Sequence, residues 1–328
     1  MDTNQTQQLF FNHIRSKLPS HLSFVDEVAE LLNISNDSAY RRIRGEKPLG
    51  LDEVQVLCNK YHVSLDQLLQ LDTNTVIFSY DRVDNLNRYL KFVINNLGQF
   101  GMLSNPHMYY YSKDIPIFHF MHFPVLRAFK FFFWKRTLIG YPELDRQQFD
   151  GEEADQELIE SAVKINALYA KVPSTDIWNE ESINVTISQV ELYRQYNLFK
   201  SNDILLKVYS ELEELVNYLE LQAETGKKTL LGQPYAHGNA SYDCYVNETL
   251  IGDNTIFVQS DNRQIAFINH IGLNFIATQD HSFCDYTYKN MQNVIRKSTH
   301  ISIVGDKERR MFFNIFRRKI HERVKNII

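Results

Sequence analysis

The sequence predicts a multidomain protein in which an all-α head of short helices precedes a larger α+β domain. That second domain should combine several long helices with a small antiparallel sheet. Helical periodicity comes in short segments up to residue 69, longer amphipathic segments fill residues 81–225, and residues 241–279 alternate by twos. We place the boundary in the polar stretch 72–75, which gives domains of residues 1–72 and 73–328.

Residues 24–32 and 36–44 form the tightest pair of predicted helices. The first carries apolar side chains at helical spacing, at Val25, Val28, Leu31 and Leu32. Asn33 follows, and asparagine tolerates the left-handed conformation that ends a helix. Ser35 is a suitable N-cap because its hydroxyl can accept a free backbone N–H. This short joint predicts a helix-turn-helix.

The second helix of the pair has two different faces. Ala39 and Ile43 lie four residues apart and form a narrow buried stripe, and the opposite side carries Asp37, Tyr40, Arg41 and Arg44. Such a face suits the major groove of DNA, where arginine donates a forked pair of hydrogen bonds to guanine. Gly45 ends the helix, and Lys47 follows in the loop.

Three further helices complete the predicted head. Residues 5–18 should form a leading helix that packs on the helical pair. Residues 51–61 form a third amphipathic helix with Val54, Leu57 and Tyr61 inward, and Ser64 caps a short fourth.

Three stretches of the head resemble a known family. They are AELLNIS (29–35), SAYRRIRGEKPL (38–49) and HVSLDQLL (62–69), and they resemble the lambda-repressor-like (XRE-type) helix-turn-helix domains, more closely their BetR-type relatives. The resemblance implies that the helix of residues 35–44 enters the major groove and that Ala29 lets the two helices cross closely. Arg42 stands where that family often has an apolar residue, so we expect Ile43 to take over its packing.

The resemblance and the arginine-bearing face together predict a transcriptional regulator that binds double-stranded DNA as a homodimer. The expected DNA-binding residues are Ser35, Asn36, Asp37, Ser38, Tyr40, Arg41, Arg44 and Lys47. Of these, Asn36, Asp37, Tyr40 and Arg41 should lie nearest the base edges, with Arg44 and Lys47 on phosphates. The alternative is a protein-interaction or small-molecule-binding module whose helical head does not bind DNA.

The charge of the head qualifies this prediction. Residues 1–72 contain seven Lys/Arg and ten Asp/Glu, a net charge of −3, whereas a DNA-binding domain is usually basic. The positive charge is concentrated in residues 41–47, at Arg41, Arg42, Arg44 and Lys47. So few phosphate contacts give modest affinity, which two copies in a dimer would raise.

The whole-chain composition is that of an ordinary globular protein, with 44% hydrophobic and 23% charged residues and a net charge of −5. The three cysteines form no ligand pattern and indicate no disulfide framework. The N-terminus MDTNQTQQ is polar and lacks signal-peptide features, and no apolar run approaches the ~20 residues that span a bilayer. We therefore expect a cytoplasmic protein without membrane contact.

The first part of the second domain should be helical. Residues 81–97 form one amphipathic helix, and the aromatic stretch 108–136 follows, with a strand at 109–111 and a helix that starts at Pro124. The helix is apolar nearly all round, which indicates a buried core. The alternatives are an aromatic-lined pocket or a dimer face rich in Phe and Tyr.

Residues 152–171, 188–199 and 203–224 should form three more helices. The last carries a heptad seam, at Leu205, Val208, Leu212, Leu215, Leu219 and Gln222. Either this helix packs on residues 152–171, which we favour, or the seam is a homodimer contact.

Residues 242–278 predict an antiparallel meander of about four strands, followed by a helix at 282–297 and a strand at 301–304. A small sheet with helices on one side often binds ligands, so a small molecule is a further candidate partner. The terminal helix, 306–325, is basic: residues 296–325 carry ten Lys/Arg and three Asp/Glu, a net +7. We interpret it as a solvated face, with a secondary phosphate contact as the alternative.

The sequence contains no recognisable catalytic, metal or cofactor motif, so we do not expect an enzyme; the third alternative is an enzyme in the C-terminal region without a recognisable motif. His119 with His122 and His281 with Cys284 have the spacing of two ligands on one helical turn, but neither pair has further ligands at a recognisable offset. Hydrolase, phosphate-binding-loop, zinc-protease and kinase motifs are absent from the sequence.

Overall fold

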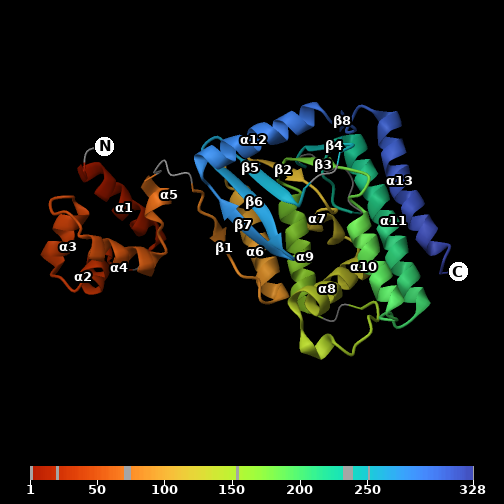
Figure 1. Cartoon of the computed structure of the whole chain (residues 1–328), viewed down its shortest axis with the longest axis horizontal. Helices are drawn as coiled ribbons and strands as arrows, with labels where there is room; N and C mark the ends of the chain where they lie inside the picture. The colour runs from red at the N-terminus through yellow and green to blue at the C-terminus, as the bar shows by residue number, and fades with distance from the viewer. Residues whose placement is uncertain are drawn as a thin grey trace. The chain divides into compact units, whose positions relative to one another are not determined.

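The structure is a computed structural model of the whole chain (Figure 1), and it describes residues 3–19, 22–69, 75–152, 155–231, 239–249 and 252–327. The chain forms two compact units, Met1–Ile77 and Phe78–Ile328. Most of the predicted boundary, 72–75, lies outside the described residues.

The first unit is all-α, as predicted. Its helices are α1 (Thr3–Lys17), α2 (Phe24–Leu31), α3 (Asn36–Ile43), α4 (Leu51–Tyr61) and α5 (Leu65–Leu69). They share one core, whose buried apolar members are Phe10, Phe11, Ile14, Val28, Ala29, Ala39, Leu57 and Val63. The leading helix α1 therefore packs on the α2–α3 pair, through these phenylalanines rather than through Leu9, which is exposed.

The turn between α2 and α3 forms for local reasons. Asn33 has a φ of 54°, in the left-handed region, and the Ile34 N–H donates to the Ala29 carbonyl at 2.9 Å. Ser35 then caps α3, because its Oγ accepts the Ser38 N–H at 3.3 Å. Gly45, with a φ of 80°, ends α3 in the same way. The predicted start and end of this helix are confirmed.

The second unit is built on a mixed eight-stranded sheet in the order β1-β7-β6-β5-β2-β3-β4-β8. The strands are β1 (Ser79–Tyr80), β2 (His107–Tyr111), β3 (Ser174–Trp178), β4 (Tyr242–Val246), β5 (Thr255–Gln259), β6 (Gln264–Ile271), β7 (Asn274–Thr278) and β8 (Thr299–His300). The sheet is larger than predicted, because β1 and β3 were missed.

The predicted four-stranded meander is wrong at its first strand. β5, β6 and β7 do form an antiparallel meander, but β4 pairs in parallel with β3, and two strands, β2 and β3, separate it from β5. Alternation along 242–246 correctly indicates a strand, yet it carries no information about the partner. The strand predicted at 301–304 is also displaced, since β8 ends at His300.

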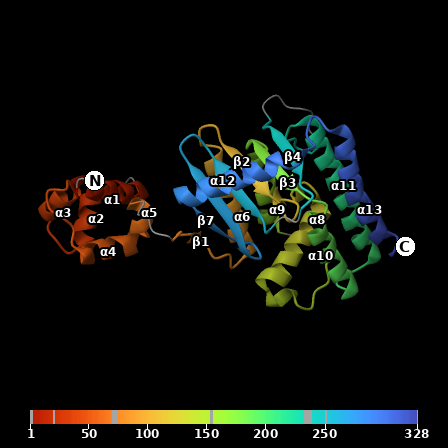
Figure 2. The same ribbon diagram turned by 45° about the horizontal axis from the view of Figure 1, so that its top comes forward.

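The helices of this unit are α6 (Leu86–Phe100), α7 (Ile117–Phe120), α8 (Pro124–Phe133), α9 (Gln156–Tyr169), α10 (Asn184–Gln195), α11 (Asn202–Thr225), α12 (His281–Arg296) and α13 (Asp306–Val324). A π-helical turn, η1 (Trp134–Ile139), continues α8, and a short 3₁₀ turn, η2 (Pro142–Leu144), follows. Helix α12 lies along one face of the sheet (Figure 2).

The pleat of the sheet divides the core between its two faces. Met108 and Tyr110 of β2 join the main core, whereas Tyr109 and Tyr111 pack against the smaller cluster around Cys284 and Met291 of α12. Residues of α6 to α11 and α13 supply much of the rest of the main core, together with residues of β3, β4, β5 and β6. Burial of the aromatic stretch 108–136 in this core is confirmed.

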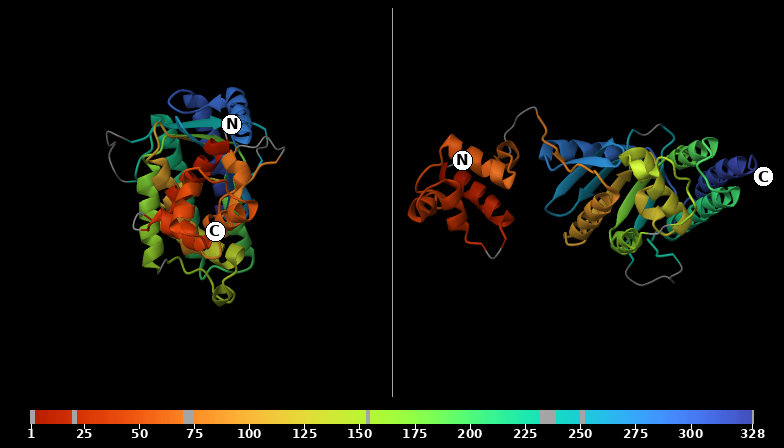
Figure 3. Two further views of the ribbon diagram at one scale, coloured as in Figure 1. Left: turned by 90° about the vertical axis from the view of Figure 1, so that its left-hand side faces the viewer. Right: turned by 90° about the horizontal axis from the view of Figure 1, so that it is seen from below.

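Helix α11 packs mainly against α13 and α8, while α9 packs mainly against α6. Figure 3 shows α11 and α13 side by side. The prediction that residues 152–171 are the main partner of α11 is therefore wrong. The heptad seam from Leu205 to Gln222 is buried inside the unit, so this stripe is not available as a homodimer contact.

The basic terminal helix α13 is largely neutralised by its neighbours. Arg317 pairs with Glu220 of α11, His321 lies 2.9 Å from Glu213, and Lys319 lies 3.3 Å from Glu181. Arg309 is buried against Asp306 at 2.9 Å. These contacts favour the interpretation of α13 as a docked helix. No helix of the described residues is long and apolar enough to cross a membrane.

Candidate nucleic-acid interface

The outward face of α3 is formed by the residues that the sequence singled out. Asn36, Asp37, Tyr40 and Arg41 are exposed along the helix, and Arg44 and Lys47 are exposed just beyond its end. Ser35 is exposed at the N-cap, and Ser38 is half-buried. These residues thus form one strip of polar and basic side chains, which runs along the outward face of α3 into the following loop.

The two arginines on this face are available to a ligand. The side chains of Arg41 and Arg44 are 54% and 59% exposed. Each is near the exposed carboxylate of Glu46, at 3.9 Å and 3.5 Å, and Arg44 also lies 5.0 Å from the ring centroid of Tyr40. Exposed pairs of this kind contribute little free energy, on the order of 0–1 kcal/mol, so DNA phosphates can displace Glu46.

Some polar residues of the strip already have partners within the head. The Asn36 side-chain amide donates to Asp26 of α2 at 2.8 Å. The hydroxyl of Ser38 accepts from Arg42 at 2.6 Å, and Ser35 is occupied by its capping bond. These two serines therefore act first on the shape of α3, and their contact with DNA remains a prediction.

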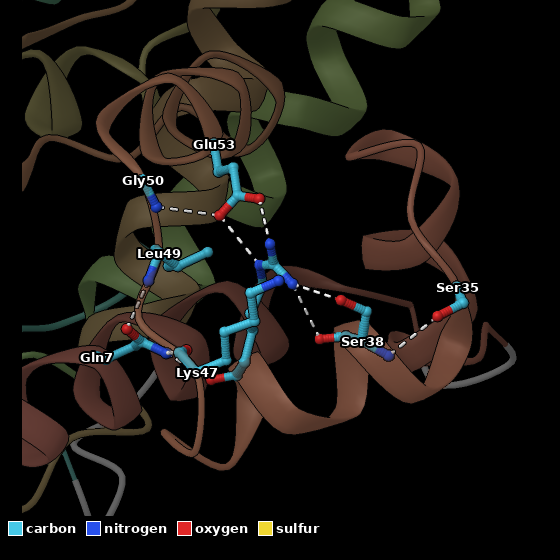
Figure 4. A network of polar contacts seen from close by, with 8 residues as sticks. Gln7, Ser35, Ser38, Lys47, Leu49, Gly50 and Glu53 are labelled. Atoms are coloured by element: carbon cyan, nitrogen blue, oxygen red, sulfur yellow. Dashed lines mark hydrogen bonds and ion pairs between the residues drawn. The ribbon is translucent and has the colours of Figure 1, made fainter.

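Arg42 is not part of the exposed basic patch. It is 6% exposed, and its guanidinium makes a two-pronged ion pair with Glu53 of α4, at 2.6 Å and 3.0 Å. Glu53 also accepts the Gly50 N–H at 3.0 Å, at the start of α4 (Figure 4). Ile43 does pack, half-buried, against the core of the head, as expected, but Arg42 unexpectedly turns inward as well, because α4 supplies a carboxylate there.

The Arg42–Glu53 pair changes the titration of the acid. The hydrogen bond from Arg42 lowers the pKa of Glu53 below its ordinary value, against the opposing effect of partial burial. The carboxylate is therefore held in its charged form, and it ties the inward face of α3 to the first turn of α4.

Gln7 is a positioning residue that we did not predict. Its amide nitrogen donates to the carbonyls of Arg42 and Lys47, at 2.6 Å and 2.8 Å, and its amide oxygen accepts the Leu49 N–H at 3.0 Å. One side chain of α1 thus holds the end of α3 and the following loop (Figure 4). Its spacing could have indicated that Gln7 faces the rest of the head, since it precedes the inward-facing Phe10, Phe11 and Ile14 by three, four and seven residues.

The electrostatics of the strip are only weakly positive. Arg41, Arg44 and Lys47 contribute three positive charges, and Asp37 and Glu46 remove two. Because Arg42 is internally neutralised, the four-cation patch counted from sequence shrinks to three. One head therefore offers few phosphate contacts.

Among the described residues, neither candidate metal pair belongs to a group of three or more His, Cys, Asp or Glu side chains that could hold a metal ion. His119 is buried 3.7 Å from Asp176, and His122 hydrogen-bonds to Asn166 and Tyr218. His281 is exposed beside Asp285, while Cys284 is buried.

Comparison with known proteins is informative for the head alone. Neither the curated proteins nor the solved structures give a significant match to the chain. Residues 19–86, about a fifth of the chain, match the BetR domain family. The α2–α3 helix-turn-helix with its exposed arginines thus belongs to a BetR domain, a DNA-binding domain of the helix-turn-helix type.

Proposed function

We propose that this protein is a cytoplasmic, homodimeric transcriptional regulator and not an enzyme. In this proposal α3 lies in the major groove in the manner of lambda-repressor-like (XRE-type) domains, and the second unit senses a signal. The observation that carries the proposal is the exposure of Arg41 and Arg44 on α3, the second helix of a helix-turn-helix that matches the BetR domain.

The proposal gives different tasks to the residues of the strip. Arg41, near the middle of the exposed face, is the candidate for a forked contact to guanine, and Asn36, Asp37 and Tyr40 flank it. Arg44 and Lys47, at the end of the helix and in the loop, are placed for phosphates. Ser35 and Ser38 support the helix and can contact the backbone from its first turn.

Selection of bound sequences from a random pool of duplex DNA tests the proposal. We expect enriched sites with two inverted half-sites, separated by about one turn of the DNA helix if the protein binds as a dimer. A pool without enrichment would favour the alternative, a protein-interaction or small-molecule-binding module with a head that does not bind DNA.

Two substitutions separate base contacts from phosphate contacts. Arg41→Ala should cost about 1–3 kcal/mol and relax the preference at one base position, whereas Lys47→Ala should weaken binding to all sequences and flatten the salt dependence. Lys60→Ala is the matched control, because Lys60 is an exposed cation near the far end of α4. Equal effects of Arg41→Ala and Lys60→Ala on the selected site would show that α3 is not the contacting face.

A further inference from the structure

The second unit contains a cavity of about 330 Å³. The proposed function does not say which class of molecule this cavity binds. Residues of α6, β2, η1 and the β5–β7 meander line it. A volume of this size lies within the range of small-molecule sites in proteins, on the order of 300–1,000 Å³.

The wall of the cavity is mainly aromatic and aliphatic. Besides two tyrosines, six aromatic side chains from five different elements contribute to it: Phe92, Phe100, Phe118, Trp134, Phe267 and Phe275. An apolar wall of this kind binds flat hydrocarbon rings by contact and by release of water. It does not by itself select one molecule.

The charged residues that line the cavity are already paired. Lys113 lies 2.6 Å from Asp253, and Asp114 lies 3.4 Å from Lys130. Lys130 is itself buried and also donates to Thr186 and Gln189, at 2.8 Å and 2.9 Å. Each charged group among the described lining residues already has a partner, so a charged ligand would have to displace that partner and would be buried less favourably than a neutral one.

Two tyrosines give the cavity its polar selectivity. Tyr89 and Tyr110 both line it, and they are 2% and 4% exposed. Their rings are held by Trp134 and Phe118, with centroid distances of 5.9 Å and 6.3 Å. Among the described residues neither hydroxyl makes a hydrogen bond within the chain, and neither oxygen is one of the fully buried unpartnered atoms, so both are open to a molecule in the cavity.

We propose that the cavity binds an uncharged, largely aromatic small molecule whose hydroxyl or carbonyl group hydrogen-bonds to Tyr89 and Tyr110. The proposal deepens the sensing role proposed above, and it names the chemical class of the signal. The ring of the ligand packs against the aromatic wall, and the two phenolic hydroxyls hydrogen-bond to the polar group of the ligand.

Calorimetric titration of the full chain, without DNA, tests the inference with three probes of one shape. They are 2-naphthol, which is neutral and can hydrogen-bond, naphthalene, which cannot, and 2-naphthoate, which is charged. We expect 2-naphthol to bind at least about tenfold more tightly than 2-naphthoate, because the carboxylate must lose its hydration and finds only a cation that already has a partner.

Conservative substitutions test whether the two tyrosines are responsible for the binding of 2-naphthol. Tyr89→Phe and Tyr110→Phe keep the rings, so each should lower the affinity for 2-naphthol about 3- to 10-fold and leave the affinity for naphthalene unchanged. Tyr196→Phe, on an exposed tyrosine outside the cavity, should change neither.

The inference is overturned if 2-naphthol does not bind, if it binds no better than 2-naphthoate, or if the Tyr89→Phe/Tyr110→Phe double variant keeps full affinity. Binding is measured without DNA, and the DNA selection is made without probe. A failure at the cavity therefore leaves the assignment of α3 intact, and a failure to bind DNA leaves the cavity result intact.

Discussion

Arg42 shows how a single buried charged side chain can fix the position of a surface helix. Its guanidinium is buried between α3 and α4 and satisfied by Glu53 and Ser38. Removal of either partner of such a pair leaves a buried charge without compensation, which costs far more than the loss of an exposed pair. The exposed Arg41 and Arg44 depend on this anchored neighbour for their direction.

Glu53→Gln should therefore destabilise the head by about 1–3 kcal/mol, because a neutral amide replaces the charged acceptor of Arg42. Hydrogen exchange of the α3 and α4 amides in the full chain measures the effect. Asp52→Asn, at the exposed position beside it, is the matched control and should change little. Similar protection loss in both variants would contradict the role given to the pair.

The same pair should make the head sensitive to acid. The folded-state pKa of Glu53 is lowered, so its contribution is fully present above the unfolded value near 4.5 and is lost as the pH falls through the folded value. Protection of α3 in the natural chain should decline below about pH 4.5, and the Glu53→Gln variant should show a smaller decline.

His122 predicts a separate pH dependence of the second unit. Tyr218 donates its hydroxyl hydrogen to the Thr229 carbonyl, so the imidazole Nε2–H donates to Tyr218 and Nδ1 accepts from Asn166. A second proton on Nδ1 would oppose the Asn166 amide. Burial, with smaller effects of His119 and Arg127, lowers the pKa of His122 to about 4.

The sign of this effect follows from the lowered pKa. The unfolded histidine binds its proton near pH 6.5 and the folded one near 4, so stability is full above 6.5 and falls between these values, by up to about 3 kcal/mol. Thermal unfolding followed by tryptophan fluorescence measures it, because Trp134 and Trp178 both lie in this unit. His122→Gln should flatten the curve, and His281→Gln, at an exposed site, should not. An unchanged slope in His122→Gln would refute the assignment.

At the scale of the element, α3 is positioned from three sides. Ser35 caps its start, Gly45 allows its left-handed end, and Gln7 of α1 holds the carbonyls beyond it. The family match begins at residue 19, after the end of α1. In this chain, the leading helix is nevertheless an integral part of the DNA-binding unit.

Gln7→Ala should thus weaken DNA binding although Gln7 is not among the residues proposed to contact DNA. Loss of three hydrogen bonds to the loop should lower the protection of residues 42–49 by about 1–3 kcal/mol and reduce affinity for the selected site several-fold. Gln5→Ala, two residues earlier in α1 and at an exposed position, is the control. Full DNA affinity in Gln7→Ala would mean that the loop is held by other contacts.

The elements that sequence could predict are those whose own pattern determines them. The helical spacing of apolar residues predicts amphipathic helices such as α6 and α11, and Asn33 and Ser35 predict the α2–α3 turn. Strand β3 does not, because all five residues of STDIW are buried and no alternation remains. Its parallel partners β2 and β4 come from distant parts of the chain, so neither the pairing nor the inward turn of Arg42 toward α4 could be predicted locally.

At the scale of the whole molecule, several of the charged groups that could compete with α3 for DNA are held in ion pairs. The basic helix α13 is paired with acids of α11 and with Glu181, and the cavity carries paired charges only among its described lining residues. The arginines of α3 stand out because their one acidic neighbour, Glu46, is exposed and weakly bound. DNA affinity should therefore come from a small and countable set of cations.

The salt dependence of DNA binding tests this count. Three cations per head, Arg41, Arg44 and Lys47, give a slope of log K against log salt concentration of about −3 for one head and about −5 for two. Fluorescence anisotropy with the selected duplex measures the slope between 50 and 200 mM salt, where the Debye length is on the order of 10 Å. Lys47→Ala should reduce its magnitude by about one unit per head, and Arg317→Ala on α13 should leave it unchanged, because Arg317 is bound to Glu220. A slope much steeper than −5, reduced by Arg317→Ala, would place the basic terminal helix on the DNA and contradict its interpretation as a docked helix.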